Sequence, residues 1–370
     1  MTGLLKDLMH DRADHLAPRA IDLEAITRNG ERRIRRRRIV GGASALTAAV
    51  ALTALAPVVF EGGSDGDDRN RIAVSEAASL TWAEGEVIHV GEQAYDIGHD
   101  VHAFVATSDG YVVVDPDGAV WSWTGGPAER VGTTRDDGSA VLVSDGGWAG
   151  WIGSDSQEYV FLNQSTGTLQ RAPVSTRVGE SDEDRLLAID GTTAYVSDQR
   201  GVVTIDLDSG EAVVIGPWKP GSEIADVEGG LILHTFRGDD GEDLTVASRE
   251  LAKKEPTLGV RGGDLSPSGR YVMSENSSTD SDRFTLLQLS DGREVTPAVA
   301  REYDFFLGYA WSDDNTYSAF GMGGLGGSNE SAVTLDLLTC EVDTRSCRVA
   351  EDHPKSFRDF EIPVGMHIGD

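Results

Sequence analysis

Carboxylates are the most concentrated reactive groups in this 370-residue sequence, and they gather in four short segments. The segments are 133–139 (TTRDDGS), 179–185 (GESDEDR), 237–244 (RGDDGEDL) and 275–283 (ENSSTDSDR). The candidate ligand residues within them are Glu180, Asp182, Glu183, Asp184, Asp239, Asp240, Glu242 and Asp243. Carboxylates brought together hold divalent cations weakly or attract a cationic protein or peptide, whereas scattered ones are ordinary solvated turns. The choice between these interpretations depends on the elements that position the four segments.

Patterns typical of catalysis are weak. His99 and His102 are the only close histidine pair, and they stand in an expected loop. The glycine-rich stretch 321–328 (GMGGLGGS) lacks the Gly-Lys-Ser/Thr ending of a phosphate-binding loop, and we expect a flexible loop there. No HExxH helix is present, and no Gly-x-Ser-x-Gly turn lies within residues 79–370. We therefore assign no catalytic, cofactor-binding or metal-ligating residue, and the sequence favours a protein that is not an enzyme.

Cys340 and Cys347 are the only two cysteines, and they flank a turn with six residues between them. On two adjacent strands this spacing places the sulfurs opposite each other, which predicts a disulfide if the compartment is oxidising. Closing so short a loop should contribute about 2–3 kcal/mol at most.

A repeat of turns and strands runs through the sequence after about residue 100. Six hairpin turns are marked by Gly110, Gly146, Gly191, Gly229, Gly269 and Asn315, at steps of 36 to 46 residues that average 41. A second turn series, exemplified by DPDG (115–118) and DLDSGE (206–211), interleaves with the first. Each unit therefore holds four short antiparallel strands, A to D, as in the blade of a β-propeller. A pair of large β-sandwiches is the alternative.

The ends of the repeat region predict how the ring closes. Residues 80–98 and 357–367 each read as an incomplete unit, and pairing them into one composite blade would remove the sheet edges. The predicted fold is thus an all-β propeller over residues 79–370, with seven blades favoured and six or eight left open. In this arrangement the D–A and B–C loops share one face, so the four acidic segments would gather there.

The turns SPSGRYVMS (266–274) and DGTTAYVSDQRGVVTIDLDSGE (190–211) resemble those of bacterial TolB-like and WD40-like β-propellers. The Trp-Asp pair that recurs in true WD40 repeats is missing. The resemblance covers most of residues 80–367, and with the N-terminal layout it is similar to membrane-anchored actinobacterial proteins. It implies an architecture, and it says little about function because propellers host both enzymes and scaffolds.

The N-terminal region predicts membrane topology. Residues 39–60 are 22 uncharged residues, enough for a helix of about 33 Å that spans a bilayer. Arg35, Arg36, Arg37 and Arg38 precede this segment, and by the positive-inside rule they are a topology signal that holds the N-terminus in the cytoplasm. Residues 1–38 would form a basic tail with short helices, and 61–78 an acidic linker. A cleaved signal, including a twin-arginine signal, and a buried globular helix are the alternatives.

The charge is divided between the two sides of the predicted membrane span. Residues 1–38 carry ten basic and six acidic residues, whereas the chain after residue 60 has 22 and 56, a net charge of −34. So acidic a body repels phosphate backbones, which argues against a nucleic-acid partner.

These observations favour a single-pass plasma-membrane protein whose extracellular propeller is a binding or scaffolding module. Its predicted partners are the membrane, through residues 39–60, and an unidentified protein or peptide that a cationic surface would suit. No cofactor is expected beyond weak divalent cations. Two other functions stay open: a signalling component that couples the propeller to a cytoplasmic partner, and a propeller hydrolase.

Overall fold

The structure is a computed structural model, and its described residues all belong to the unit Arg35–Asp370. The predicted tail, membrane span and linker, including Arg35–Arg38, lie outside the described residues. Within the described ranges, no helix has the length and apolar composition needed to cross a bilayer. The described ranges are 80–134, 141–154, 158–173, 185–198, 200–216, 223–237, 243–251, 257–274, 284–324, 334–350 and 360–365.

The described strands form seven antiparallel sheets, six with four strands and one with three. Blade 1 consists of β27 (Phe360–Glu361), β1 (Thr81–Glu84), β2 (Val87–Val90) and β3 (Gln93–Asp96). Blade 2 contains β4 (Ala103–Thr107), β5 (Gly110–Val114), β6 (Ala119–Trp123) and β7 (Glu129–Thr133), and blade 3 contains β8 (Val143–Asp145), β9 (Trp148–Ile152), β10 (Glu158–Asn163) and β11 (Thr168–Pro173). Blade 4 contains β12 (Arg185–Asp190), β13 (Thr193–Asp198), β14 (Gly201–Asp206) and β15 (Ala212–Gly216).

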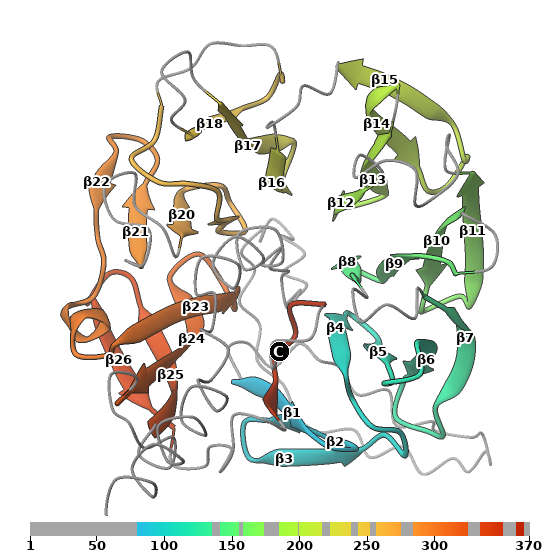
Figure 1. Cartoon of the computed structure of the whole chain (residues 1–370), viewed down its shortest axis with the longest axis horizontal. Helices are drawn as coiled ribbons and strands as arrows, with labels where there is room; N and C mark the ends of the chain where they lie inside the picture. Colours follow the sequence, from blue (N-terminus) through green and yellow to red (C-terminus); the bar gives the residue numbers. More distant parts are fainter. Residues whose placement is uncertain are drawn as a thin grey trace, which may run out of the picture. The chain divides into compact units, whose positions relative to one another are not determined.

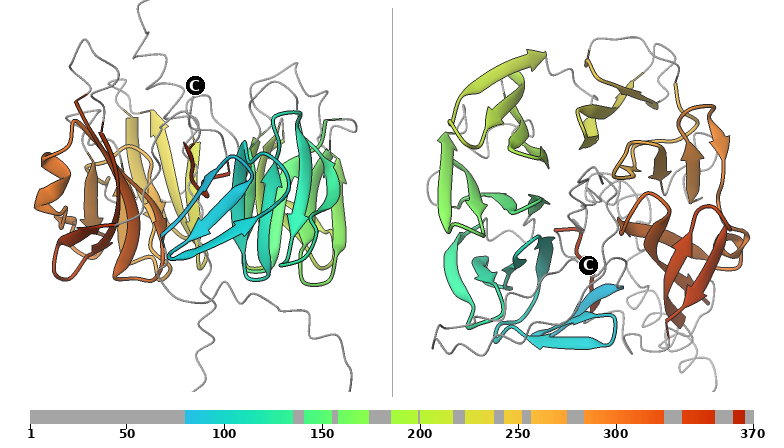
Figure 2. Two further views of the ribbon diagram at one scale, coloured as in Figure 1. Left: turned by 90° about the horizontal axis from the view of Figure 1, so that it is seen from below. Right: turned by 180° about the vertical axis from the view of Figure 1, so that it is seen from behind.

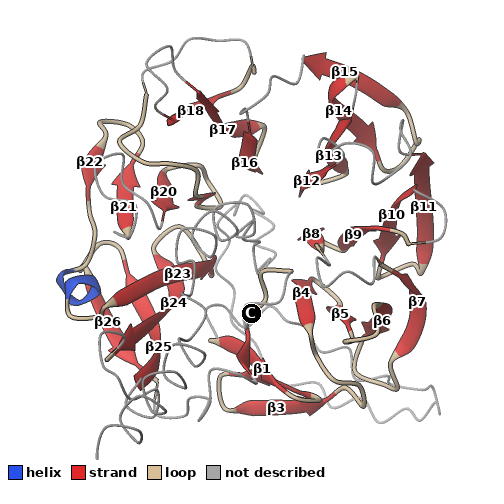
Figure 3. Cartoon of the chain, viewed as in Figure 1, coloured by secondary structure: helices blue, strands red, loops and turns tan. Residues whose placement is uncertain are grey.

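The remaining three blades follow in chain order. Blade 5 contains β16 (Glu223–Glu228), β17 (Leu231–Arg237) and β18 (Asp243–Ser248). Blade 6 contains β19 (Asp264–Leu265), β20 (Tyr271–Ser274), β21 (Thr285–Gln288) and β22 (Arg293–Glu294), and blade 7 contains β23 (Phe305–Trp311), β24 (Thr316–Gly323), β25 (Thr334–Glu341) and β26 (Ser346–Val349). A short 3-10 helix, Ala298–Arg301, joins blades 6 and 7 (Figure 3).

The blades stand in chain order around a ring (Figure 1), which confirms the predicted seven-blade propeller. The first strand of each of blades 2 to 7 lies on the inner side and the last strand lies outermost. Figure 2 shows the strands running from one face of the ring to the other. Because each blade is a meander, A–B and C–D turns share one face, and B–C and D–A connections share the opposite one.

The ring closes through a composite blade, as the two incomplete sequence units predict. β27 pairs with β1 in antiparallel register, Ala83 with Glu361 and Glu84 with Phe360. Blade 1 is also bonded to blade 7, because the Tyr309 hydroxyl of blade 7 donates to the Thr81 carbonyl of β1 at 3.1 Å. The first and last described strands thus share a sheet, in which β27 is the inner edge strand and covers β1.

Most A–B turns have the backbone that the glycine series predicts. Gly146, Gly191, Gly229 and Gly269 adopt φ values between 53° and 68°, a region where a side chain is strained. Asn315 was expected to play the same role, but it lacks positive φ. In that turn the Asp313 carboxylate instead accepts the backbone N–H of Asn315 at 2.7 Å and that of Thr316 at 2.8 Å.

Blade 5 differs from the expected four strands. Its described residues form three strands, and in place of the fourth there is a single bridge between Thr245 and Leu258. The DPDG turn was grouped with DLDSGE in the second turn series, but it joins β5 to β6, strands B and C of blade 2, whereas DLDSGE joins β14 to β15, strands C and D of blade 4. Turn composition alone does not indicate which pair of strands a turn connects.

The glycine-rich stretch is in part a strand, which corrects the expectation of a loop. Gly321, Met322 and Gly323 end β24, and residues 325–328 lie outside the described ranges. A Cβ on Gly321 would stand 2.6 Å from the Tyr303 ring, so glycine leaves room for this ring to pack on the strand. The Tyr303 hydroxyl in turn donates to Asp336 on β25 at 2.8 Å.

The hydrophobic core is divided into layers between neighbouring blades. One cluster joins Val112 and Val120 of blade 2 to Trp151 and Val160 of blade 3, and comparable clusters lie between the other consecutive pairs from blade 1 to blade 7. A strand presents alternate residues to its two sides, so a blade buried on both sides needs apolar residues at successive positions. β4 and β5 are buried along their whole length for this reason.

Carboxylates before the turn glycines link consecutive blades. Asp145, which ends β8, accepts the backbone N–H of Gly191 in the next blade at 2.6 Å. Asp190, which ends β12, accepts those of Gly229 and Gly230 at 3.1 and 2.7 Å. The N–H groups of these turns thus bond outside their own hairpin, and the preceding blade supplies the acceptor. These carboxylates therefore position blades.

Candidate functional site

The acidic segments lie in connections that the strand order assigns to one face. Segments 133–139 and 179–185 are D–A connections, from β7 to β8 and from β11 to β12, whereas 237–244 and 275–283 are B–C connections, from β17 to β18 and from β20 to β21. The described strand ends at these four places therefore point to the same face. Of the eight candidate carboxylate residues, Asp243 begins β18 opposite Arg237, and the other seven lie outside the described residues. Their clustering as a ligand surface stays a prediction.

The C-terminal segment reaches the inner side of the ring (Figures 1 and 2). After β27, Ile362 and Val364 are fully buried. The Gly365 N–H donates to the Phe104 carbonyl at 2.9 Å, and the Gly365 carbonyl accepts the Leu142 N–H at 2.7 Å. Gly365 therefore connects the end of the chain to the inner strand of blade 2 and to the residue that precedes blade 3.

The buried carboxylate of Asp226, on an inner strand, accepts hydrogen bonds from the backbone. Asp226 of β16 accepts the backbone N–H of Leu265 on β19 at 2.9 Å and that of Val227 at 2.8 Å. Accepting two N–H bonds satisfies a buried carboxylate, and the first bond joins blades 5 and 6. Asp226 is therefore part of the blade contacts.

The histidine pair falls between β3 and β4. His99 stacks on the Trp121 ring at a centroid distance of 3.5 Å, and the Trp121 Nε1–H donates to Asp115 at 2.9 Å. Among the described residues, no group of three or more His, Cys, Asp or Glu side chains is arranged to hold a metal ion.

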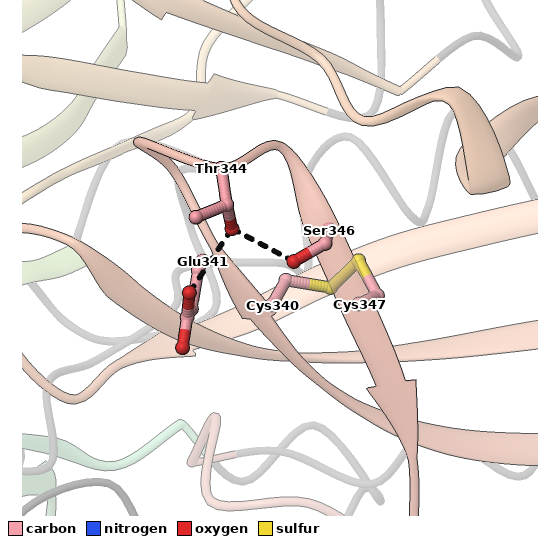
Figure 4. The surroundings of a disulfide bond; sticks show 5 residues. All are labelled: Cys340, Glu341, Thr344, Ser346 and Cys347. Atoms are coloured by element: carbon pink, nitrogen blue, oxygen red, sulfur yellow. Dashed lines mark hydrogen bonds between the residues drawn. A yellow bond between two sulfur atoms is a disulfide. The ribbon is translucent and has the colours of Figure 1, made fainter.

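Cys340 and Cys347 face each other across β25 and β26, and a disulfide joins them (Figure 4). Cys340 is fully buried in the core cluster between blades 6 and 7. The turn that the bridge closes is also held by hydrogen bonds from Thr344 to Glu341 at 3.0 Å and between Thr344 and Ser346 at 2.7 Å. The disulfide therefore cross-links the two outer strands of blade 7.

Removing this disulfide should lower the unfolding free energy only slightly. We expect the Cys340→Ala/Cys347→Ala double variant to lose about 2 kcal/mol of unfolding free energy, because the bridged loop is short. Urea unfolding of the oxidised wild type, the reduced wild type and the double variant measures the loss. A loss above about 5 kcal/mol would contradict a purely local role.

Four tyrosines predict a loss of stability at alkaline pH. Burial raises the pKa of Tyr111, Tyr309 and Tyr317 well above the usual range. Burial, followed by the hydrogen bond to Asp336, raises the pKa of Tyr303 to about 12. Their stabilisation is complete below the unfolded pKa of about 10 and falls as the pH rises above it, by about 1.4 kcal/mol per pH unit for each of the buried Tyr111, Tyr309 and Tyr317 and by less for the more exposed Tyr303.

Urea unfolding at about pH 9 and about pH 11 tests this slope. The Tyr317→Phe variant is the control, since no described residue bonds the buried Tyr317 hydroxyl. We expect this variant to be as stable as the wild type at neutral pH and to lose less stability at high pH. An unchanged slope in the variant would contradict the assignment.

A cavity of about 380 Å³ lies between β7 of blade 2 and strands β9 to β11 of blade 3, and the sequence did not indicate it. In blade 3 Val160 is in register with Trp151 on one side and with Arg171 on the other, so the three side chains share one side of the sheet. Blade 2 contributes Arg130 and Gly132 to the opposite wall. We call this feature the arginine cleft.

The arginine cleft has polar groups around an apolar wall. Arg171 forms an ion pair with Glu158 at 3.4 Å, whereas the structure gives Arg130 no ion pair with any described residue. The hydroxyls of Thr133 and Ser154 bond each other at 2.8 Å at the rim. Arg130 and Arg171 stand 41 positions apart on different strands, so only the packing of one blade on the next reveals that they line one cavity.

Comparison with known proteins gives similarities of fold alone. No family model and no curated protein matches the sequence. AztD from Citrobacter koseri is 14% identical over 76% of this chain and 83% of its own, with a TM-score of 0.40. A protein assigned as TolB from Agrobacterium tumefaciens is 12% identical over 74% of this chain and 88% of its own (TM-score 0.37), and BamB from Moraxella catarrhalis is 12% identical over 72% and 83% (TM-score 0.35). The propeller assignment rests on the sheet topology described above.

Proposed function

We propose that this chain is a single-pass membrane protein whose extracellular propeller binds a cationic protein or peptide at the cell envelope. One observation carries the binding part of the proposal: the described strands that flank all four acidic segments end at the same face of the ring. A ring of stacked blades gives such loops a rigid support, and a face with many carboxylates attracts positive charge.

The membrane part of the proposal comes from the sequence. Residues 39–60 are uncharged, and they are preceded by Arg35–Arg38. With the N-terminus inside, the propeller is outside, where a disulfide such as Cys340–Cys347 persists.

A pair of reporters fused after Asp370 tests the topology. Alkaline phosphatase, which is active only outside the cytoplasm, is expected to be active there, and a reporter that needs the cytoplasm is expected to be silent. The reverse result would overturn the membrane part of the proposal and would leave the binding part to be tested separately.

An octalysine peptide tests the acidic face. The variant Asp239→Asn/Asp240→Asn/Asp243→Asn removes three charges from one B–C connection, and we expect binding at low salt to weaken about tenfold. The matched control, Asp208→Asn/Asp291→Asn/Asp343→Asn, removes three exposed charges from C–D turns on the opposite face. Equal losses in the two variants would show a general charge effect and would overturn the proposed binding face.

A further inference from the structure

We infer that the arginine cleft is a binding site for a small organic carboxylate that carries an apolar group. This inference does not depend on the proposed function, because the site lies between two blades and has the opposite charge to the acidic face. Its volume of about 380 Å³ is within the range of pockets that bind small molecules.

The charge in the arginine cleft is local and positive. Arg130 and Arg171 contribute two guanidinium groups, and Glu158 offsets one of them. The chain as a whole carries a net charge of −30, so most of its surface repels anions. Two guanidinium forks suit a carboxylate in particular, because each can donate two parallel hydrogen bonds to it.

Trp151 holds a buried donor next to the arginine cleft. The ring is only 1% exposed, and its Nε1–H has no hydrogen-bond partner among the described residues. A buried N–H without a partner is uncommon and destabilising by itself. A Cβ on Gly132 would stand 3.2 Å from this nitrogen and 2.9 Å from Cζ2, so the glycine keeps the edge of the indole clear of side-chain atoms on the side of the cleft.

The apolar wall specifies the rest of the ligand. Val131, Val160 and Trp151 line the arginine cleft between the arginines and the core of the two blades. Val160 and Trp151 are already buried, so the apolar group of an acid would cover Val131 and the aliphatic stems of the two arginines, which an inorganic anion would leave in contact with water.

The test uses N-acetyl-L-phenylalanine as the probe and its neutral amide as the matched analogue, measured by calorimetry on the full chain in detergent. We expect the acid to bind and the amide to bind at least tenfold more weakly. Arg130→Ala and Arg171→Ala should each weaken binding of the acid about tenfold. Arg348→Ala is the control, because Arg348 is equally exposed but lies on the outer strand of blade 7.

Three results would overturn the inference. The acid and the amide could bind equally well, or the three arginine variants could bind alike. Inorganic phosphate could also displace the acid at equal concentration, which would mean that the cleft takes any anion. A tetrapeptide that ends in phenylalanine distinguishes the source of the carboxylate: tighter binding than the free acid indicates a polypeptide C-terminus, and equal binding indicates a small metabolite. Thermal unfolding of each variant confirms that it is folded.

Discussion

A chain that ends at residue 359 should fail to form a stable propeller. This deletion removes β27, and with it the inner strand that pairs with β1. It also removes Phe360, Ile362 and Val364, which are 0–1% exposed. Burying three such side chains contributes about 5–9 kcal/mol, comparable to the whole stability of a typical domain.

The matched control is a chain that ends at residue 365, which keeps β27 and the hydrogen bonds of Gly365. We expect its circular dichroism and thermal unfolding to match those of the full chain. A synthetic peptide of residues 357–370 should restore the truncated chain in part, because it can add the missing strand to β1. If the chain ending at 359 melted within a few degrees of the control, the closure described here would be wrong.

The Gln164→Ala substitution should be the most damaging exchange of a polar residue outside the chain ends. Gln164 is only 7% exposed and follows β10 of blade 3, yet its side chain is bonded within blade 2. Its Nε2 carries two hydrogens and lies within hydrogen-bond distance of three acceptors, the carbonyls of Tyr111 and Trp123 at 3.0 and 3.1 Å and the Ser122 hydroxyl at 2.9 Å. Its Oε1 accepts the Thr107 hydroxyl. Alanine leaves these buried groups without their partner, which costs about 3 kcal/mol or more.

Gln170→Ala on the neighbouring strand is the control for this exchange. Gln170 lies on β11 of the same blade and is only partly buried, so its removal should cost less than about 0.5 kcal/mol. Urea unfolding of the two variants measures the difference. Equal losses would mean that the network around Gln164 does not stabilise the contact between blades 2 and 3.

Features that depend on the local repeat could be predicted well. The turn series with a mean step of 41 residues predicted six full units, and the half-units at 80–98 and 357–367 predicted the composite blade that made seven the favoured number. The cysteines could be paired because a single hairpin holds both. In each case neighbours along the chain, or the two ends of a closed ring, carry the whole signal.

Predictions failed where the same residue types serve different connections. DPDG at 115–118 has the composition of a C–D turn, but it joins strands B and C, because turn chemistry reflects backbone angles and not the position of a turn in a blade. Asn315 stands at a glycine position, but the Asp313 carboxylate holds that turn in another way. Leu258 makes a bridge where a fourth strand was expected, since a four-strand repeat does not require every blade to pair fully.

The sequence by itself determined the repeat, the way the ring closes and the distribution of charge, and it favoured seven blades over six or eight, because turns and alternating strands follow from neighbouring residues. The tertiary structure alone decided which side chains meet between blades. Asp190 reaches the turn at Gly229, Gln164 reaches the carbonyl of Trp123, and Arg130 and Arg171 line one cleft. Each pair is about 40 residues apart, and nothing local marks either partner. Such contacts depend on the packing of one blade on the next, which no single repeat encodes.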